Sequence, residues 1–306
     1  MLPAVPSRAT AKPPPPTTHR RIPVRPPPLG TAGVLALWSC GALSALCLWL
    51  VLSALVLGSV QYHADQGRLY DTFREQLANS TAPLGPTTTG APVALLGSYL
   101  GGPDGVVVVE GTSSAQTQQG PGHRRDSVLP GQPGVCVLFG RATTYGGPFG
   151  AITRLQPGDR VTTTTGQGEF VYRVDDVRRR GDPLPLPLAP GAGRLTLATV
   201  EGASWSNGFT AKNVVFVDAT LQGKSQLPDA AYPSTIPASE QLMAGDSSSI
   251  LPLMLWIQLL FVVACVLGWA QVRWGRWQSW LVGVPVLLAV LWSASTTAAQ
   301  LLPNLL

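Results

Sequence analysis

Residues 140–149 read Gly-Arg-Ala-Thr-Thr-Tyr-Gly-Gly-Pro-Phe, and residues 194–201 read Arg-Leu-Thr-Leu-Ala-Thr-Val-Glu. The second stretch is rich in β-branched and apolar residues, which is typical of a strand. The first follows the apolar run 134–139 and contains the glycines and proline of a loop. Together they predict two strands of one β-domain, one of which ends in a glycine-rich loop.

The sequence around these stretches continues the same pattern. Short apolar runs bounded by Gly and Pro predict strands at 93–99, 105–110, 134–139, 159–165, 169–177, 194–200 and 213–220. Gly166-Gln167-Gly168 predicts a tight hairpin between two of them. Seven β-rich segments without a helix of comparable length predict a closed barrel or a sandwich.

The ordered set of motifs resembles the actinobacterial class E sortases over residues 92–221. Besides the two opening stretches, the matching segments are Val108-Val109-Glu110-Gly111-Thr112, Gly120-Pro121-Gly122-His123, Leu129-Pro130-Gly131-Gln132-Pro133-Gly134, Leu155-Gln156-Pro157-Gly158-Asp159 and Tyr172-Arg173-Val174. The resemblance implies an all-β sortase-type eight-stranded barrel, here with flanking transmembrane α-helices.

The resemblance also implies a chemistry whose residues are missing. These sortases are transpeptidases that act on sorting signals of the Leu-Pro-x-Thr-Gly or Leu-Ala-x-Thr-Gly type, with a cysteine nucleophile, a histidine acid/base and an arginine. Val200 stands at the cysteine position and Arg141 at the histidine position, and Lys212 is the cation nearest the arginine position. A valine has no nucleophilic atom, and an arginine stays protonated at physiological pH. The sequence therefore predicts a pseudo-sortase without catalysis, cofactor or metal.

The residues expected to form a peptide groove are retained. They are Thr143, Thr144, Tyr145, Pro148, Phe149 and Thr199. Their retention permits a barrel that binds an extended peptide without cutting it. Equally, they could do no more than preserve the strand and loop geometry.

Substitute catalytic residues are few. Cys136 is a displaced nucleophile or a small core side chain, and His123 is a relocated base or a structural loop residue. Ser204 and Ser206 have no identifiable base nearby. The run Arg178-Arg179-Arg180 is a polyanion grip or a solvated, ion-paired turn, and the latter is favoured.

The charge distribution predicts a membrane topology. All 16 acids lie between Asp65 and Asp246, where 14 basic residues leave a net charge of −2 (14 minus 16). The other seven basic residues flank apolar runs, as the positive-inside rule describes, so no nucleic-acid partner is expected. The predicted segments are a Pro/Arg-rich cytoplasmic tail (1–30), an anchor (31–60), a juxtamembrane helix and linker (61–91), the barrel (92–221), a polar linker (222–248), a second span (249–271), a cytoplasmic loop (272–279) and a third span (280–306).

Three functions are consistent with this pattern. The leading one is an inactive plasma-membrane protein with residues 61–248 outside the cell, binding a sorting-signal peptide, a true sortase or an envelope protein. The second is a transpeptidase or hydrolase with a non-standard nucleophile. The third is a membrane-assembly subunit of a surface complex.

Overall fold

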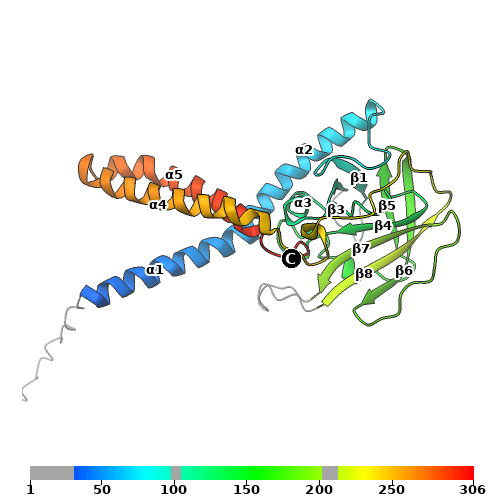
Figure 1. The fold of residues 1–306 in the computed structure, drawn as a ribbon, viewed down its shortest axis with the longest axis horizontal. Coiled ribbons are helices and arrows are strands. Elements are labelled where there is room, and N and C mark those ends of the chain that lie inside the picture. The colour runs from blue at the N-terminus through cyan, green and yellow to red at the C-terminus, as the bar shows by residue number, and fades with distance from the viewer. Residues whose placement is uncertain (1–30, 98–104, 202–212) are drawn as a thin grey trace, which may run out of the picture. The chain divides into compact units, whose positions relative to one another are not determined.

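A computed structural model describes residues 31–97, 105–201 and 213–306. The Pro/Arg-rich tail, Ser204, Ser206 and Lys212 lie outside these ranges. Within them, eight strands close into a barrel in the order β1-β2-β3-β4-β7-β8-β6-β5, which confirms the predicted fold (Figure 1). The strands are β1 Pro92–Leu96, β2 Val106–Glu110, β3 Gly122–His123, β4 Gly134–Phe139, β5 Arg160–Thr165, β6 Gly168–Arg179, β7 Gly193–Glu201 and β8 Asn213–Gln222.

Strands β4, β7 and β8 are neighbours. The first opening stretch, 140–149, follows β4, and the second, 194–201, lies in β7. Strand β4 pairs parallel to β7 from Gly134↔Gly193 to Phe139↔Ala198. Strand β8 pairs antiparallel to the other edge of β7, with Val200 opposite Val214. The predicted hairpin is also present, because Thr165 pairs with Gly168. The eighth strand, β3, has only two residues and pairs with β2 and β4.

The barrel interior is an apolar cluster contributed by every strand except β3. Alternate residues of β5 and β7 point inward, as the period of two in a strand requires. Phe149 and Ile152 extend this cluster from the loop between β4 and β5, where a short 3₁₀ turn, η2 Ile152–Arg154, follows.

The chain enters the barrel through helical segments. Helix α1 spans Thr31–Leu52, a π-helical turn η1 spans Ser53–Leu57, and helix α2 spans Gly58–Ala78. One face of α2 packs on the barrel, where Phe73 is buried against Val107. A six-residue helix, α3 Ser114–Gln119, follows β2.

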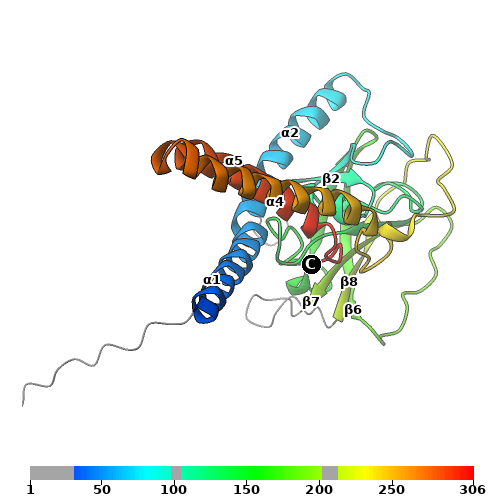
Figure 2. The ribbon, with the colours of Figure 1, turned by 60° about the vertical axis from the view of Figure 1, so that its left-hand side comes forward.

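Two further helices follow the barrel. Helix α4 spans Ile250–Arg273 and helix α5 spans Arg276–Ala299, and they lie side by side in both views (Figures 1 and 2). By length and composition, the segments Ser247–Arg273 and Trp277–Ala299 could each cross a membrane. Short 3₁₀ turns, η4 Ala238–Glu240 and η5 Ser247–Ser249, precede them.

The last helix stops short of the 280–306 span expected from sequence. It ends at Ala299, and residues 300–306 leave it in turns. Pro303 has no N–H to continue a helix, and its ring crowds the preceding turn. The segment 300–306, called here the post-helix segment, instead returns to the barrel.

Candidate functional site

The loop after β4 and the end of β7 meet through two hydrogen bonds. Gly140 N donates to the Ala198 carbonyl at 3.0 Å, and Thr199 Oγ1 donates to the Gly140 carbonyl at 2.9 Å. Arg141 and Val200 are each the next residue along the chain from this junction. The two sequence-predicted catalytic positions therefore each follow this junction, Arg141 in the loop after β4 and Val200 near the end of β7.

Arg141 is completely buried. Its Nη1 donates to Thr144 Oγ1 at 3.0 Å, and its Nη2 donates to the Ser114 carbonyl at 3.1 Å and to Ser114 Oγ at 2.6 Å. The guanidinium also lies 5.1 Å from the centre of the Tyr145 ring. Arg141 therefore joins α3 to the loop that follows β4.

The chemistry of Arg141 follows from this environment. Burial lowers its pKa to about 10, and Tyr145 opposes that shift. At neutral pH the group is still protonated, and all its nitrogens are donors, so it cannot accept a proton from a nucleophile. No carboxylate of the described ranges 31–97, 105–201 and 213–306 pairs with it.

Val200 lies in an apolar patch on the outer face of β4, β7 and β8. It is 3% exposed and clusters with Phe139, Ala198, Leu305 and Leu306. Only methyl groups reach this surface at the predicted nucleophile position. The patch can bury an apolar side chain, but it offers no atom that can attack a carbonyl.

The six residues expected to form a groove divide into two groups. Thr143 and Thr144 both contact the post-helix segment, and Thr199 braces the β4–β7 junction. Tyr145 instead packs with Tyr62, Val106 and Ala299, and its φ of 49° places its backbone in the left-handed region. Phe149 is in the barrel core, and Pro148 is half-buried beside it in the chain.

The post-helix segment is the part of this site that sequence reasoning missed. Asn304, Leu305 and Leu306 are 0%, 0% and 3% exposed. Ala142 N donates to the Leu305 carbonyl at 3.1 Å, and Thr144 N donates to the Leu306 carbonyl at 3.0 Å. Pro303 was the available signal, because a proline this late in an apolar run marks the end of a helix.

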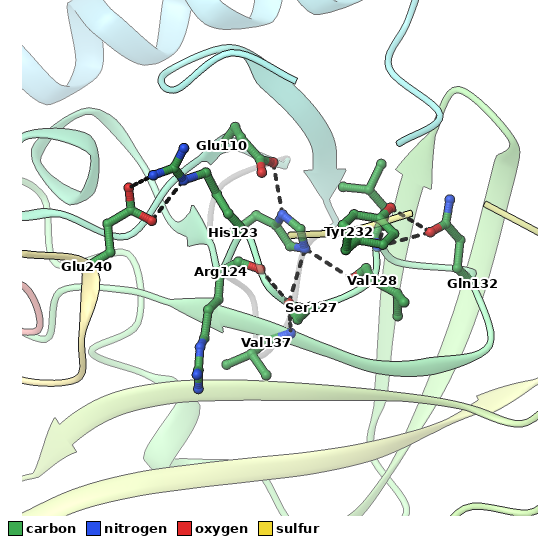
Figure 3. Close-up of polar contacts among 11 residues, drawn as sticks. Glu110, His123, Arg124, Ser127, Val128, Gln132, Val137, Tyr232 and Glu240 are labelled. Carbon is green, nitrogen blue, oxygen red and sulfur yellow. Dashed lines mark hydrogen bonds and ion pairs between the residues drawn. The ribbon is translucent and has the colours of Figure 1, made fainter. Parts of the chain in front are cut away.

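A second polar cluster surrounds His123, as Figure 3 shows. Nδ1 of His123 lies 2.9 Å from Glu110 Oε2, and Nε2 lies 3.0 Å from the Val128 carbonyl. Both partners are acceptors, so both ring nitrogens carry hydrogen. Burial opposes the charged ring, but hydrogen bonds with Cys136 and Glu110 outweigh it and raise the pKa of His123 to about 10.

This arrangement decides what Cys136 can do. The thiol is 1% exposed, and burial raises its pKa, so it is protonated at neutral pH. His123 has no free lone pair with which to deprotonate it, since both ring nitrogens donate. The structure thus places both sequence candidates in contact, in the geometry of a buried ion-paired core rather than an open nucleophile.

The segment between β8 and α4 is bound to the barrel by an ion pair and hydrogen bonds. Arg125 Nη2 lies 2.7 Å from Glu240 Oε1, and Tyr232 Oη donates to Gln132 Oε1 at 2.6 Å. Gln132 Nε2 in turn donates to the Leu84 carbonyl at 2.8 Å. Part of the predicted polar linker therefore packs as structure on the barrel.

The arginine run at the end of β6 is ion-paired, as favoured from sequence. Arg178 pairs with Asp218 and lies over the Phe216 ring at 5.3 Å. Arg179 makes two hydrogen bonds to Glu201, at 2.8 and 2.9 Å. These two guanidiniums already have carboxylate partners, which argues against a polyanion grip.

Comparison with known proteins identifies the fold of this region. A family model described as the Sortase domain matches residues 105–219, a segment that includes Arg141 and Val200. Sortase D of Bacillus subtilis (strain 168) is 34% identical over 67 residues, which cover 22% of this chain and 32% of that protein. The chain thus spans about a third of the length of that curated relative.

Solved structures give similar matches. The Sortase D5 transpeptidase of Clostridium perfringens is 22% identical, with 52% of this chain and 99% of that chain covered at a TM-score of 0.44. Sortase C-1 of Actinomyces oris is 23% identical, with 43% and 75% covered at a TM-score of 0.34.

Proposed function

We propose that this chain, whose residues 105–219 match the Sortase domain family model, is a catalytically inactive, membrane-anchored member of that family that binds an extended peptide. The peptide is a sorting signal or a segment of a cell-envelope protein or a true sortase, and the barrel faces the cell exterior. The class E resemblance of the sequence supports this assignment. One observation carries it: Arg141 is buried and hydrogen-bonded and Val200 lies in an apolar cluster, at the two positions where the resemblance implies a base and a thiol.

The side chains next to these positions support peptide binding. The outer face near Val200 is apolar, and the amides of Ala142 and Thr144 donate to main-chain carbonyl groups of the post-helix segment. Main-chain donors beside an apolar patch are the features by which proteins hold extended peptides. A transpeptidase would need in addition a nucleophile and a proton acceptor, and neither side chain supplies one.

The membrane anchoring rests on the helices and on charge. Arg273 and Arg276 lie at the turn between α4 and α5, and both other ends of this helix pair meet where Asp246 N donates to the Gln300 carbonyl at 2.9 Å. A pair of spans of this kind returns the chain to the side it left. The positive-inside rule then puts the arginines in the cytoplasm and residues 61–248 outside.

The contact of Cys136 with His123 is the one observation that favours the rival cysteine-enzyme function. Burial of the Cys136 sulfur argues against that function, because a peptide carbonyl would have to enter the core between β3 and β4 to reach the sulfur. The third function, a membrane-assembly subunit, draws on exposed apolar side chains of α4 such as Phe261 and Trp269. Such side chains equally suit contact with lipid.

A peptide-cleavage assay on the full chain in detergent tests the proposal. Leu-Pro-x-Thr-Gly and Leu-Ala-x-Thr-Gly peptides are incubated with the protein and an amine acceptor, and products and adducts are measured by mass spectrometry. We expect neither cleavage nor an adduct, in wild type and in Cys136→Ala alike. Cleavage by wild type that Cys136→Ala abolishes would establish the rival enzyme instead.

A further inference from the structure

The post-helix segment makes specific contacts with the surface next to Val200. Two main-chain carbonyls, those of Leu305 and Leu306, accept hydrogen bonds from the amides of Ala142 and Thr144. The Leu306 carbonyl also accepts from Thr144 Oγ1 at 2.7 Å and from Thr143 Oγ1 at 3.2 Å. The loop that follows β4 thus binds this segment, which runs in turns, through hydrogen bonds to its backbone.

Side chains of the segment are held as firmly as its backbone. Asn304 Nδ2 donates to the Thr112 carbonyl at 2.7 Å and to the Gln241 carbonyl at 2.9 Å. Leu305 and Leu306 are buried in one cluster with Val200. A chain segment that only ended a membrane helix in solvent would make none of these contacts. The segment is therefore held against the barrel as a bound ligand would be.

Arg141 takes part in this binding through Thr144. Its Nη1 donates to Thr144 Oγ1, whose own hydrogen goes to the Leu306 carbonyl. A hydroxyl that accepts from a cation is a stronger donor, because the two hydrogen bonds polarise one another. The arginine at the predicted histidine position therefore strengthens a contact to a peptide carbonyl.

We propose that residues 304–306 are an intramolecular peptide ligand that covers the apolar surface beside Val200, called here the groove, and that the external ligand of this surface is an apolar peptide of the same Asn-Leu-Leu chemistry. This inference rests on the proposed peptide-binding function. An external peptide binds only when this segment leaves.

Because the segment is covalently joined to the barrel, it fills the groove for most of the time. A segment joined by a short connection competes at an effective concentration in the millimolar range, roughly. If the segment itself binds the groove with an intrinsic dissociation constant of about 10 μM, a free peptide would bind the full chain about 100-fold more weakly than a chain lacking the segment. The groove is thus closed at rest and opened by removal of its own ligand.

A binding experiment with the full chain in detergent tests this. A fluorescent Leu-Pro-Asn-Leu-Leu peptide is titrated against wild type, against a variant lacking residues 302–306, and against Gln300→Ala. The last variant is the control, because the Gln300 side chain lies in the same segment but makes none of its contacts to the groove described above. We expect binding to the deletion variant about 100-fold tighter than to wild type and to Gln300→Ala. Equal affinity for all three overturns the inference.

A labelling measurement keeps the test valid if the deletion unfolds the protein. In Val200→Cys the new thiol lies under Leu305 and Leu306, and its alkylation is followed by mass spectrometry of that peptide. We expect alkylation roughly tenfold faster or more when Asn304→Ala is added, because the segment then detaches more often. Equal rates with and without Asn304→Ala overturn the inference.

Failure of the inference differs from failure of the proposed function. If a Leu-Pro-x-Thr-Gly peptide binds wild type and the deletion variant equally, the function stands and the intramolecular ligand is refuted. If a folded deletion variant binds neither peptide, the groove binds no such peptide and both proposals fall.

Discussion

Arg141 donates from Nη1 to Thr144 Oγ1 at 3.0 Å, and both side chains are completely buried. Together with Ser114, the pair joins helix α3 to the loop after β4. In the sortases that the sequence resembles, the position of Arg141 holds a base that must face substrate. Here the cation faces Ser114 and Thr144, and its charge reaches the groove only through a hydroxyl.

Replacing Thr144 by valine tests this relay. Thr144→Val keeps the shape of the side chain but leaves Arg141 Nη1 without its partner and removes one of the three donors to the Leu306 carbonyl. Leaving buried polar groups unsatisfied costs about 1–3 kcal/mol, so we expect the free energy of unfolding to fall by that amount. Chemical denaturation of the full chain in detergent measures it.

Thr143→Val is the matched control for Thr144→Val. Thr143 is half-buried, and its single bond to Leu306 is longer, at 3.2 Å. We expect a smaller loss of stability from this change. Equal losses in the two variants would contradict a special role for the hydroxyl beside Arg141.

Alkaline pH should destabilise the fold through His123. Its pKa in the folded protein is raised from 6.5 to about 10, because hydrogen bonds with Cys136 and Glu110 outweigh the opposing effect of burial. A raised pKa means that the stabilisation is complete below about pH 6.5 and is lost as pH rises toward about pH 10. From about pH 7 to about pH 8.5 we expect a loss of at most about 2 kcal/mol.

The measurement is the pH dependence of unfolding of the full chain, compared with His123→Gln. The window ends below 9.0, the ordinary pKa of the Cys136 thiol, whose folded pKa is also raised. The variant will be less stable throughout, so the slope with pH is the informative quantity. A slope that persists in His123→Gln would assign the effect to another group.

Much of the barrel could be predicted from sequence, because its strands are long enough to show alternation. Strands β5 and β6 alternate buried and exposed positions and are joined by a glycine-bounded turn. Strand β3 could not be found this way, since Gly122-His123 is too short for any period to appear. His123 therefore looked like a loop residue, although it pairs with Glu110 across two strands.

The site was predicted only in part, for a different physical reason. The substitutions at Arg141 and Val200 are visible from motif order, but their partners come from distant parts of the chain. Leu305 and Leu306 are apolar, and hydrophobicity alone cannot distinguish burial in lipid from burial against protein. The third partner, Ser114, is a polar helix residue with no local signal that it meets Arg141.

Cys136 should resist alkylation in the native protein. Its sulfur is buried, and the raised pKa keeps it protonated at neutral pH, so the reactive thiolate is scarce. We expect iodoacetamide to label Cys136 only after denaturation, as read by mass spectrometry of its peptide. Val200→Cys combined with Asn304→Ala provides the comparison, because its thiol lies on the outer face and the covering segment then detaches more often. Rapid native labelling of Cys136 would reopen the cysteine-enzyme hypothesis.

A buried ion pair and a solvent-exposed ion pair should respond differently to mutation. Glu240 is 4% exposed and pairs with Arg125, while its carbonyl accepts from Thr112 Oγ1 at 2.6 Å. Breaking a buried pair by neutralising one member leaves an uncompensated charge and costs about 3–5 kcal/mol at most. We expect Glu240→Gln to lower stability by a part of this, because Arg125 is partly exposed.

Arg179→Ala is the contrasting change, since its pair with Glu201 is open to solvent on both sides. Solvent screens such a pair, so we expect no measurable change in unfolding. Amide hydrogen exchange in Glu240→Gln measures the local effect of this change. Because the segment around Gln241 also holds Asn304, detachment of that segment should speed exchange at the Ala142 and Thr144 amides. Unchanged exchange there would mean that the linker and the groove are independent.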